Sequence, residues 1–230
     1  MSTIADNIAN VRERIHRAAV SAHRNPDLVT LMAVSKTRPA SAIRDIWACG
    51  VRDIGENYLQ EALDKIHALD DLPLTWHFIG PIQSNKTKAI AENFAWVHSV
   101  DRLKIAQRLS DQRPEHLPPL NICLQVNISH EASKSGVLPE ELGALALAVA
   151  KLPHLNLRGL MAIPAPADDE AGRRAPLQAL REAMAALPLP LDSLSMGMSD
   201  DLTEAVQEGS TIVRIGTALF GQRDYPPSNA

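Results

Sequence analysis

Short apolar runs alternate with longer stretches in which apolar residues recur every three or four positions, along the whole chain. A run of about four to eight apolar residues bounded by turn-forming residues is typical of a strand buried on both faces. Eight such runs predict strands: LVTLMAVSK (28–36), VRDIGEN (51–57), LTWHFIG (74–80), FAWVHSV (94–100), NICLQVN (121–127), LRGLMAI (157–163), SLSMG (193–197) and TIVRIG (211–216).

Amphipathic segments predict helices between these strands. The first lies within residues 1–20, where Ile4, Ile8, Val11 and Ile15 share one face and charges are spread throughout, so it is not a signal peptide. The others span residues 40–48, 58–69, 83–92, 101–111, 138–151, 168–187 and 200–208, and RIGTALFG opens one more after the last strand.

Strand and helix repeated eight times within 230 residues is the pattern of a (β/α)₈ barrel. We therefore expect an α/β fold, a single TIM barrel with an extra N-terminal helix, and one domain over residues 1–230. A doubly wound open sheet is the alternative, but its GxGxxG fingerprint is missing, because the first strand ends in SKTRP. The linker-like segments 112–120 and 165–176 fit inside the strand–helix rhythm.

Charge and cysteine content exclude several classes of function. Lys and Arg number 23 against 27 Asp and Glu, so no basic surface indicates nucleic acid or anionic lipid as a partner. Cys49 and Cys123 show no CxxC spacing, which fits a reducing compartment, and the histidines show no metal-ligand spacing. The longest apolar stretch, 144–150, is too short to span a bilayer. We expect a cytoplasmic protein without a membrane segment or metal.

The residues that close the strands form the candidate site, because a (β/α)₈ barrel binds its ligand at the C-terminal ends of its strands. Lys36 follows the first strand, where a solvated cap is the ordinary interpretation. The other strand ends carry Asn57, His77, Ser99 or Asp101, Asn127, Met161, Ser199 and Arg214, the last followed by Gly216 and Thr217.

The loops after the seventh and eighth strands have the composition of an anion site. Ser199 in SMGMSDDL and Gly216 with Thr217 in RIGTALFG supply hydroxyls and backbone N–H groups where helices begin. Singly, Ser199 is an ordinary N-cap and Gly216 a turn residue, and the acidic Asp200 and Asp201 complement a helix N-terminus. Ser199, Gly216 and Thr217 together lie in the two loops where barrels commonly hold phosphate, so they predict a phosphate site.

Lys36 lies beside that site, because strands 1 and 8 of a closed barrel are neighbours. An amine reacts with an aldehyde only when unprotonated, and burial at the barrel mouth near Arg38 or Arg214 favours that form. Lysine, phosphate site and barrel together predict pyridoxal 5′-phosphate held as a Schiff base. A barrel that binds another phosphorylated metabolite would leave Lys36 charged and unreactive.

The chain also resembles the pyridoxal phosphate homeostasis proteins, the YggS/PROSC family, over essentially its whole length. The motifs that carry the resemblance are AVSKTRPA, GENYLQEALDKI, WHFIGPIQSNK, SKSG, RGLMAI, LSMGMSDD and VRIGTALFG. The family is similar in fold to the N-terminal barrel of bacterial alanine racemase and ornithine decarboxylase, the type III fold of pyridoxal phosphate proteins. It is described as a monomeric barrel that binds the cofactor without an established enzymatic activity.

The resemblance implies a role for each candidate residue. Lys36 would be the Schiff-base lysine and Arg214 the partner of the pyridine nitrogen, while Ser199, Gly216 and Thr217 would hold the phosphate. The remaining matches to motif positions near the cofactor are Asn57, His77 and Met161, although a core histidine hydrogen-bonded to backbone is an equal interpretation of His77. The implied function is storage or buffering of pyridoxal phosphate, or its delivery to apo-enzymes, in vitamin B6 homeostasis.

A pyridoxal-phosphate-dependent amino-acid racemase is the alternative function. Racemases need a base on both faces of the cofactor, and in alanine racemases the second is a tyrosine supplied across a dimer with a separate C-terminal domain. This chain has only Tyr58 and Tyr225 and ends at Ala230, so we expect cofactor binding without catalysis. Lys134, in SKSG, is a candidate secondary acceptor of the cofactor, against the simpler interpretation of a solvated loop lysine.

Overall fold

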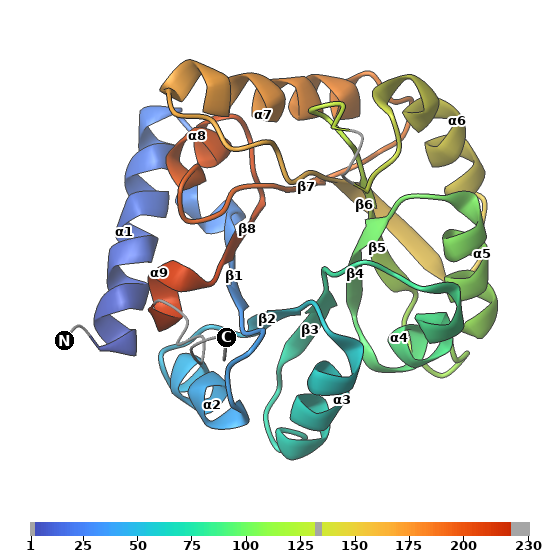
Figure 1. Cartoon of the computed structure of the whole chain (residues 1–230), viewed down its shortest axis with the longest axis horizontal. Coiled ribbons are helices and arrows are strands. Elements are labelled where there is room, and N and C mark those ends of the chain that lie inside the picture. The colour runs from blue at the N-terminus through green and yellow to red at the C-terminus, as the bar shows by residue number, and fades with distance from the viewer. Residues whose placement is uncertain (1–2, 132–134, 222–230) are drawn as a thin grey trace, which may run out of the picture.

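The computed structural model describes residues 3–131 and 135–221, and its strands close into a parallel barrel in the order β1 to β8, with β8 paired to β1 (Figure 1). The strands are β1 (Thr30–Val34), β2 (Asp53–Glu56), β3 (Thr75–Phe78), β4 (Trp96–Val100), β5 (Leu120–Gln125), β6 (Leu155–Met161), β7 (Ser193–Ser195) and β8 (Ile212–Ile215). The helices are α1 (Ile4–Ser21), α2 (Ala40–Ala48), α3 (Leu59–Ala68), α4 (Thr87–Asn93), α5 (Leu103–Gln112), α6 (Pro139–Val149), α7 (Glu170–Ala185), α8 (Leu202–Gln207) and α9 (Thr217–Phe220).

The barrel confirms the predicted (β/α)₈ fold with its extra N-terminal helix, and the differences are local. Strand β1 starts two residues later than expected, because Pro26–Leu28 forms a 3₁₀ turn that ends just before it. Another 3₁₀ turn, Ser84–Lys86, takes the place of the first residues expected in α4. Strand β6 begins and ends two residues earlier than predicted. No helix in the described ranges is long and apolar enough to cross a membrane.

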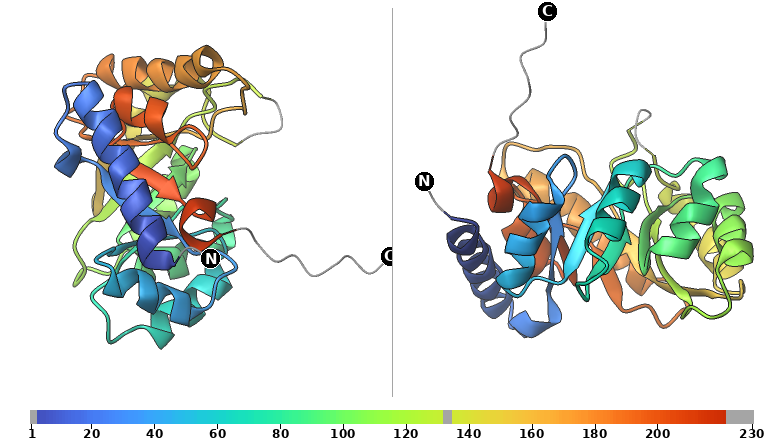
Figure 2. Two further views of the ribbon diagram at one scale, coloured as in Figure 1. Left: turned by 90° about the vertical axis from the view of Figure 1, so that its left-hand side faces the viewer. Right: turned by 90° about the horizontal axis from the view of Figure 1, so that it is seen from below.

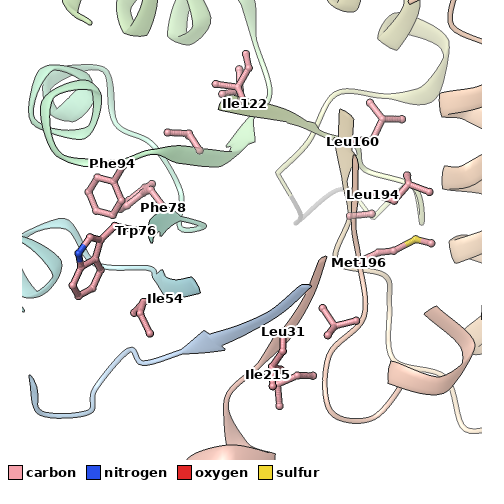
Figure 3. Close-up of a cluster of buried hydrophobic side chains, with 14 of the residues drawn as sticks. Leu31, Ile54, Trp76, Phe78, Phe94, Ile122, Leu160, Leu194, Met196 and Ile215 are labelled. Atoms are coloured by element: carbon pink, nitrogen blue, oxygen red, sulfur yellow. The ribbon is translucent and has the colours of Figure 1, made fainter. Parts of the chain in front are cut away.

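Alternate residues of each strand face the helices and build the main core. Leu31, Ile54, Phe78, Leu160 and Ile215 belong to this layer and are buried between strands and helices (Figure 3). Their neighbours in sequence therefore face the barrel interior. Burial of the helix-facing layer is the main stabilising contribution to the fold.

The barrel interior is unusually polar for this fold, whose interiors are mostly filled by branched apolar residues. A small apolar cluster of Met32, Ile79 and Ile212 occupies part of it, packed against Val34 and Trp96. The buried side chains of His77, His98, Ser195 and Arg214 are joined there by hydrogen bonds. This interior therefore carries charge and hydrogen-bonding groups up to the C-terminal mouth.

Helix α1 covers the part of the barrel formed by the end of the chain and packs against α8 and α9, as the left view of Figure 2 shows. Asn7 Nδ2 donates to Leu219 O of α9 at 2.8 Å, and Arg14 Nη2 donates to Ser199 O at 2.9 Å. Arg24, after the end of α1, donates to backbone oxygens of Val206 and Ser210. Helix α1 thus anchors the loops that follow β7 and β8.

Candidate functional site

A cavity of about 270 Å³ lies at the C-terminal ends of the strands. The residues that line it are Val34, Lys36, Asn57, Ile79, Ile163, Met198, Ser199, Asp200, Arg214, Gly216 and Thr217. Six of the eight residues predicted to bind the cofactor are among them, contributed by the segments that follow β1, β2, β7 and β8 and by β8 itself. The structure therefore brings the lysine and the predicted phosphate loops to one site.

Lys36 occupies a tightly held turn two residues beyond the end of β1. The next residue, Thr37, has φ +66°, a left-handed conformation that is uncommon outside glycine. Helix α3 holds both sides of this turn: Lys65 Nζ donates to Ser35 O at 2.7 Å, and Thr37 N donates to Glu61 Oε1 at 2.6 Å. The backbone on either side of Lys36 is therefore fixed by charged groups.

A buried ion cluster supports this turn. Lys65 Nζ lies 2.6 Å from Glu56 Oε1 and 2.5 Å from Glu61 Oε1, and the Ser35 hydroxyl donates to Glu56 Oε1. The Glu56 side chain is fully buried and that of Lys65 is 6% exposed. Burial raises the pKa of Glu56, while the hydrogen bonds from Lys65 and Ser35 oppose that shift. The motif GENYLQEALDKI thus supplies a support for the lysine turn, a role that sequence reasoning missed.

Arg214 forms the floor of the cavity and is itself buried. Its guanidinium donates to Ser195 O at 2.6 Å, to Ser195 Oγ at 2.9 Å and to Ala162 O at 2.8 Å. Burial lowers the pKa of Arg214 to about 10, so the group remains cationic at neutral pH. The contacts to carbonyl oxygens fix its plane at the base of the pocket.

The two loops predicted to hold phosphate approach the cavity closely because of their glycines. Gly197 has φ +100°, and a Cβ there would lie 2.6 Å from Ala205 Cβ, so the turn after β7 requires glycine. A Cβ on Gly216 would lie 3.3 Å from Val34 O, next to the lysine strand. The hydroxyl-bearing residues Ser199 and Thr217 line the same cavity. Side by side, these loops can offer hydroxyl and backbone donors to an anion.

Asp201, one of the two acidic residues after Ser199, does not cap the helix through its side chain as expected. Asp201 is the N-cap residue of α8, yet its side chain makes no capping bond to the helix. Its Oδ1 instead accepts from Met198 N at 2.7 Å and closes the turn that carries Ser199. Burial raises the pKa of Asp201. The role is still structural, but it shapes the loop and does not satisfy the first helical amides.

Asn57 lines this cavity and also an adjoining one of about 260 Å³ that Gln125 and Asn127 help to form. Its Oδ1 is buried and has no hydrogen-bond partner among the residues that the structure describes. A buried acceptor without a donor costs free energy of about 1–3 kcal/mol, so a ligand that offers a donor there would be favoured. Together with an amine, a guanidinium and two hydroxyls, this acceptor fits a polar cofactor that carries an aldehyde and a phosphate.

His77 and Met161 do not line the cavity. His77 is buried inside the barrel, with Nδ1 2.9 Å from His98 Nε2 and Nε2 2.9 Å from Asp53 Oδ1. Met161 is fully buried at the end of β6, where it pairs with Gln125 and Ser195 in the neighbouring strands. The structure therefore places these two residues inside the barrel and not among the residues that line the cavity. The candidate Lys134, like Tyr225, lies outside the described residues.

Within residues 3–131 and 135–221, the structure contains no group of three or more His, Cys, Asp or Glu side chains that could hold a metal ion. His98, which sequence reasoning set aside for lack of ligand spacing, bonds Ser195 Oγ through Nδ1 at 2.7 Å. No local motif indicated this contact, because the two residues are 97 positions apart.

Comparison with known proteins places the chain among barrels of similar sequence and fold. The family described as alanine racemase, N-terminal domain, matches residues 1–224. A pyridoxal phosphate homeostasis protein of Pseudomonas aeruginosa is 67% identical over 98% of both chains, and one of Escherichia coli K12 is 53% identical over 98% of this chain and 99% of that one.

Solved structures agree with these sequence matches. PipY of Synechococcus elongatus, determined with pyridoxal phosphate bound, is 41% identical, covers 92% of this chain and 100% of its own, and has a TM-score of 0.78. Alanine racemase of Corynebacterium glutamicum, at 19% identity and a TM-score of 0.67, shares the fold. The chain therefore belongs to the alanine racemase N-terminal domain family and, within it, to the pyridoxal phosphate homeostasis proteins.

Proposed function

We propose that this chain binds pyridoxal 5′-phosphate in the cavity at the C-terminal mouth of the barrel and acts in the homeostasis of that cofactor. The observation that carries the proposal is the meeting of Lys36, Arg214, Ser199 and Thr217 around one cavity. The names of its relatives and the cofactor in PipY support it. The chain works as a single binding domain over residues 1–230.

The residues of the cavity match the parts of the cofactor. When bound, pyridoxal phosphate supplies an aldehyde that condenses with an amine, and the Lys36 amine holds it as a Schiff base. The Ser199 and Thr217 hydroxyls, with the backbone at Gly216, hold the phosphate at the loops that follow β7 and β8. Arg214 donates toward the pyridine nitrogen from the floor. His77 and Met161 act from beneath the cavity, without direct contact.

The protein stores or buffers the cofactor, or delivers it to apo-enzymes, and does so as a cytoplasmic monomer without catalysis of its own. A bound aldehyde is withheld from unwanted amines, and a Schiff base that forms reversibly can release it. Delivery predicts that the loaded protein activates an apo-enzyme faster than the cofactor dissociates into solution. An apo-enzyme mixed with loaded protein, with and without a scavenger of free pyridoxal phosphate, measures that difference.

The decisive experiment is reductive trapping. Purified protein loaded with pyridoxal phosphate should show the visible absorbance of a Schiff base, and borohydride should fix one adduct, located at Lys36 by peptide mass spectrometry. Lys36→Ala should abolish the band and leave the circular dichroism unchanged, because Lys36 contributes reactivity and little core packing. Lys88→Ala, whose side chain is 71% exposed on α4, is the matched control and should behave as wild type. A full, reducible band in Lys36→Ala would overturn the assignment.

A further inference from the structure

A continuous series of hydrogen bonds runs through the barrel interior from the cofactor cavity to the opposite end. Arg214 Nη1 lies 2.9 Å from Ser195 Oγ, which lies 2.7 Å from His98 Nδ1. His98 Nε2 lies 2.9 Å from His77 Nδ1, and His77 Nε2 lies 2.9 Å from Asp53 Oδ1. Asp53 lines a second cavity, of about 480 Å³, together with residues of α1 and residues at the start of β1. This cavity lies away from the cofactor pocket.

The direction of every bond in this series follows from its two ends. A guanidinium can only donate and a carboxylate can only accept. Because Ser195 Oγ accepts from Arg214, its one hydrogen is available to His98 Nδ1. His98 then donates from Nε2 to His77 Nδ1, and His77 donates from Nε2 to Asp53. Both imidazoles are therefore neutral, and both carry their proton on Nε2.

The reverse direction is disfavoured by burial. It would require a doubly protonated His77 that donates from both nitrogens, and it would leave the Ser195 hydroxyl hydrogen with no acceptor in the series. Burial lowers the pKa of His77, with Asp53 opposing the shift. Burial, with the positive charge of Arg214 nearby, lowers the pKa of His98 well below its ordinary value. Neutral imidazole rings in this enclosed interior agree with hydrogen bonds that all donate in the direction from Arg214 to Asp53.

Arg214 needs such a connection. Its guanidinium donates to two backbone oxygens and one hydroxyl, and no carboxylate lies within ion-pair distance of it in the described part of the chain. The charge of Asp201 raises the pKa of Arg214 against the effect of burial, but from beyond that distance. A buried cation that no carboxylate contacts is costly. In the series of bonds, each acceptor atom faces the Arg214 side and each hydrogen faces Asp53. The aligned dipoles thus stabilise the cation at one end and the carboxylate at the other.

We propose that this one-directional hydrogen-bonded chain positions Arg214 for the cofactor and couples its cation to the carboxylate of Asp53. The inference rests on the proposed function for the identity of the ligand. His77, His98 and Ser195 are positioning residues, since they act on the cofactor through Arg214. The polar interior of the barrel is explained in the same way, because an apolar filling would leave Arg214 without this partner.

Nitrogen-15 NMR of the histidine side chains tests the direction in the protein without cofactor. At neutral pH, His77 and His98 should both give the signals of the neutral form protonated on Nε2. Ser195→Ala should shift the His98 Nδ1 signal, whereas Ser193→Ala should leave it unchanged, because the Ser193 hydroxyl bonds Asp192, the residue just before the strand. A cationic ring, or a proton on Nδ1 of either histidine, would overturn the proposal even if the cofactor binds as expected.

Cofactor affinity tests the coupling between Asp53 and Arg214. Asp53→Asn keeps the shape of the side chain and removes its charge, so pyridoxal phosphate should bind at least about fivefold more weakly, within the usual range of coupling between distant sites. Asp27→Asn, at the rim of the same lower cavity, is the control and should bind as wild type. Equal affinity in the two variants would refute the coupling between Asp53 and Arg214. Absence of binding in the wild-type protein would instead refute the proposed function and leave the NMR result standing.

Discussion

The two sides of the cofactor cavity are held in different ways. On the lysine side, the turn at Lys36 is fixed by α3 through the buried charges of Glu56 and Lys65 and through Glu61. On the phosphate side, the loops after β7 and β8 are fixed by α1 through side-chain donors to backbone oxygens. The lysine side therefore depends on charges that cannot be removed singly, while the phosphate side depends on replaceable contacts.

The difference fits the chemistry proposed for each side. A covalent bond to an aldehyde needs one amine at a defined position, which a fixed turn supplies. A phosphate is recognised by several donors, and each adds part of the binding free energy. Buried ion pairs seldom raise stability over apolar residues of similar size, so the cluster at Lys65 is better understood as a positioning device. Substitutions on the lysine side should thus lower the stability of the fold, whereas those on the phosphate side should lower the affinity for the cofactor.

The largest effect should come from Lys65→Met. It leaves the Glu56 carboxylate buried without its cation, so the free energy of unfolding should fall by about 3–5 kcal/mol in urea denaturation. Glu56→Gln combined with Lys65→Met should recover most of that loss, since no uncompensated charge remains, yet should form the borohydride-fixed adduct more slowly. Lys88→Met is the surface control. If the double variant matches wild type in adduct formation, the cluster has no positioning role.

Acid should diminish the effect of Lys65→Met. Burial raises the pKa of Glu56 above its ordinary value of 4.5, so as the pH falls the folded chain takes up this proton before the unfolded chain does. Protonation removes the buried charge, and stability relative to wild type should rise as the pH falls from neutral toward that value. A stability difference that is constant with pH would show that Glu56 is not the source of the loss.

Substitutions on the phosphate side should weaken binding and leave the fold intact. Ser199→Ala and Thr217→Ala each remove one hydrogen bond to a charged group, about 1.5–3 kcal/mol, so affinity should fall roughly ten- to hundredfold. Reductive trapping at saturating cofactor should still label Lys36. Ser193→Ala is again the control. Wild-type retention of cofactor after dialysis of both variants would place the phosphate elsewhere.

The support from α1 should have a smaller effect. Arg14→Ala removes the bond to Ser199 O, and one hydrogen bond of about 1 kcal/mol corresponds to roughly fivefold weaker binding. Stopped-flow measurement of cofactor release should show a faster rate. Arg12, on the same helix, bonds the oxygens of Cys49 and Gly50 away from the cavity, so Arg12→Ala is a matched control. Equal release rates in the two variants would show that α1 does not stabilise the cofactor site through Arg14.

The sequence predicted the fold well because its signals are local. Each strand is a short apolar run, each helix has a periodic face, and strand order follows from chain order in a barrel. The rim residues Lys36, Ser199 and Thr217 could be predicted in the same way, since the C-terminal end of each strand is a fixed place in this fold.

The supports of the site could not be predicted, because they join residues far apart in sequence. Glu56 looks like an ordinary strand residue, and Lys65 like an ordinary member of an amphipathic helix, until the fold brings Ser35 against them. Asp53 and His98 carry no motif, and only the closed barrel sets them in line with Arg214. His77 was recognised from a motif that places it near the cofactor, but the motif does not tell whether its ring faces the ligand or the interior.

The smallest expected effect concerns amino-acid racemisation, for which the two sides of the cavity are unequal. The lysine side offers one base in Lys36, whereas no tyrosine or histidine lines the cavity within the described residues. The floor is also unfavourable. Arg214 stays cationic at neutral pH and favours an unprotonated pyridine nitrogen, which makes the ring a weaker electron sink than a carboxylate partner would.

Loaded protein incubated with L-alanine in deuterium oxide should therefore show no inversion beyond a trace. Ordinary enzymes turn over at about 1–10³ per second, and chiral chromatography with mass detection resolves rates far below that range. Lys36→Ala sets the background, because it removes the only amine expected to take the α-proton. Deuterated D-alanine formed at an enzymatic rate by wild type and not by Lys36→Ala would mean that a second base, such as the Asp200 carboxylate that lines the cavity, acts there, and would replace the carrier with a racemase. An equal rate of inversion in wild type and Lys36→Ala would mean that the lysine side only holds the cofactor. This agrees with the fixed position that the buried charges give to the Lys36 turn.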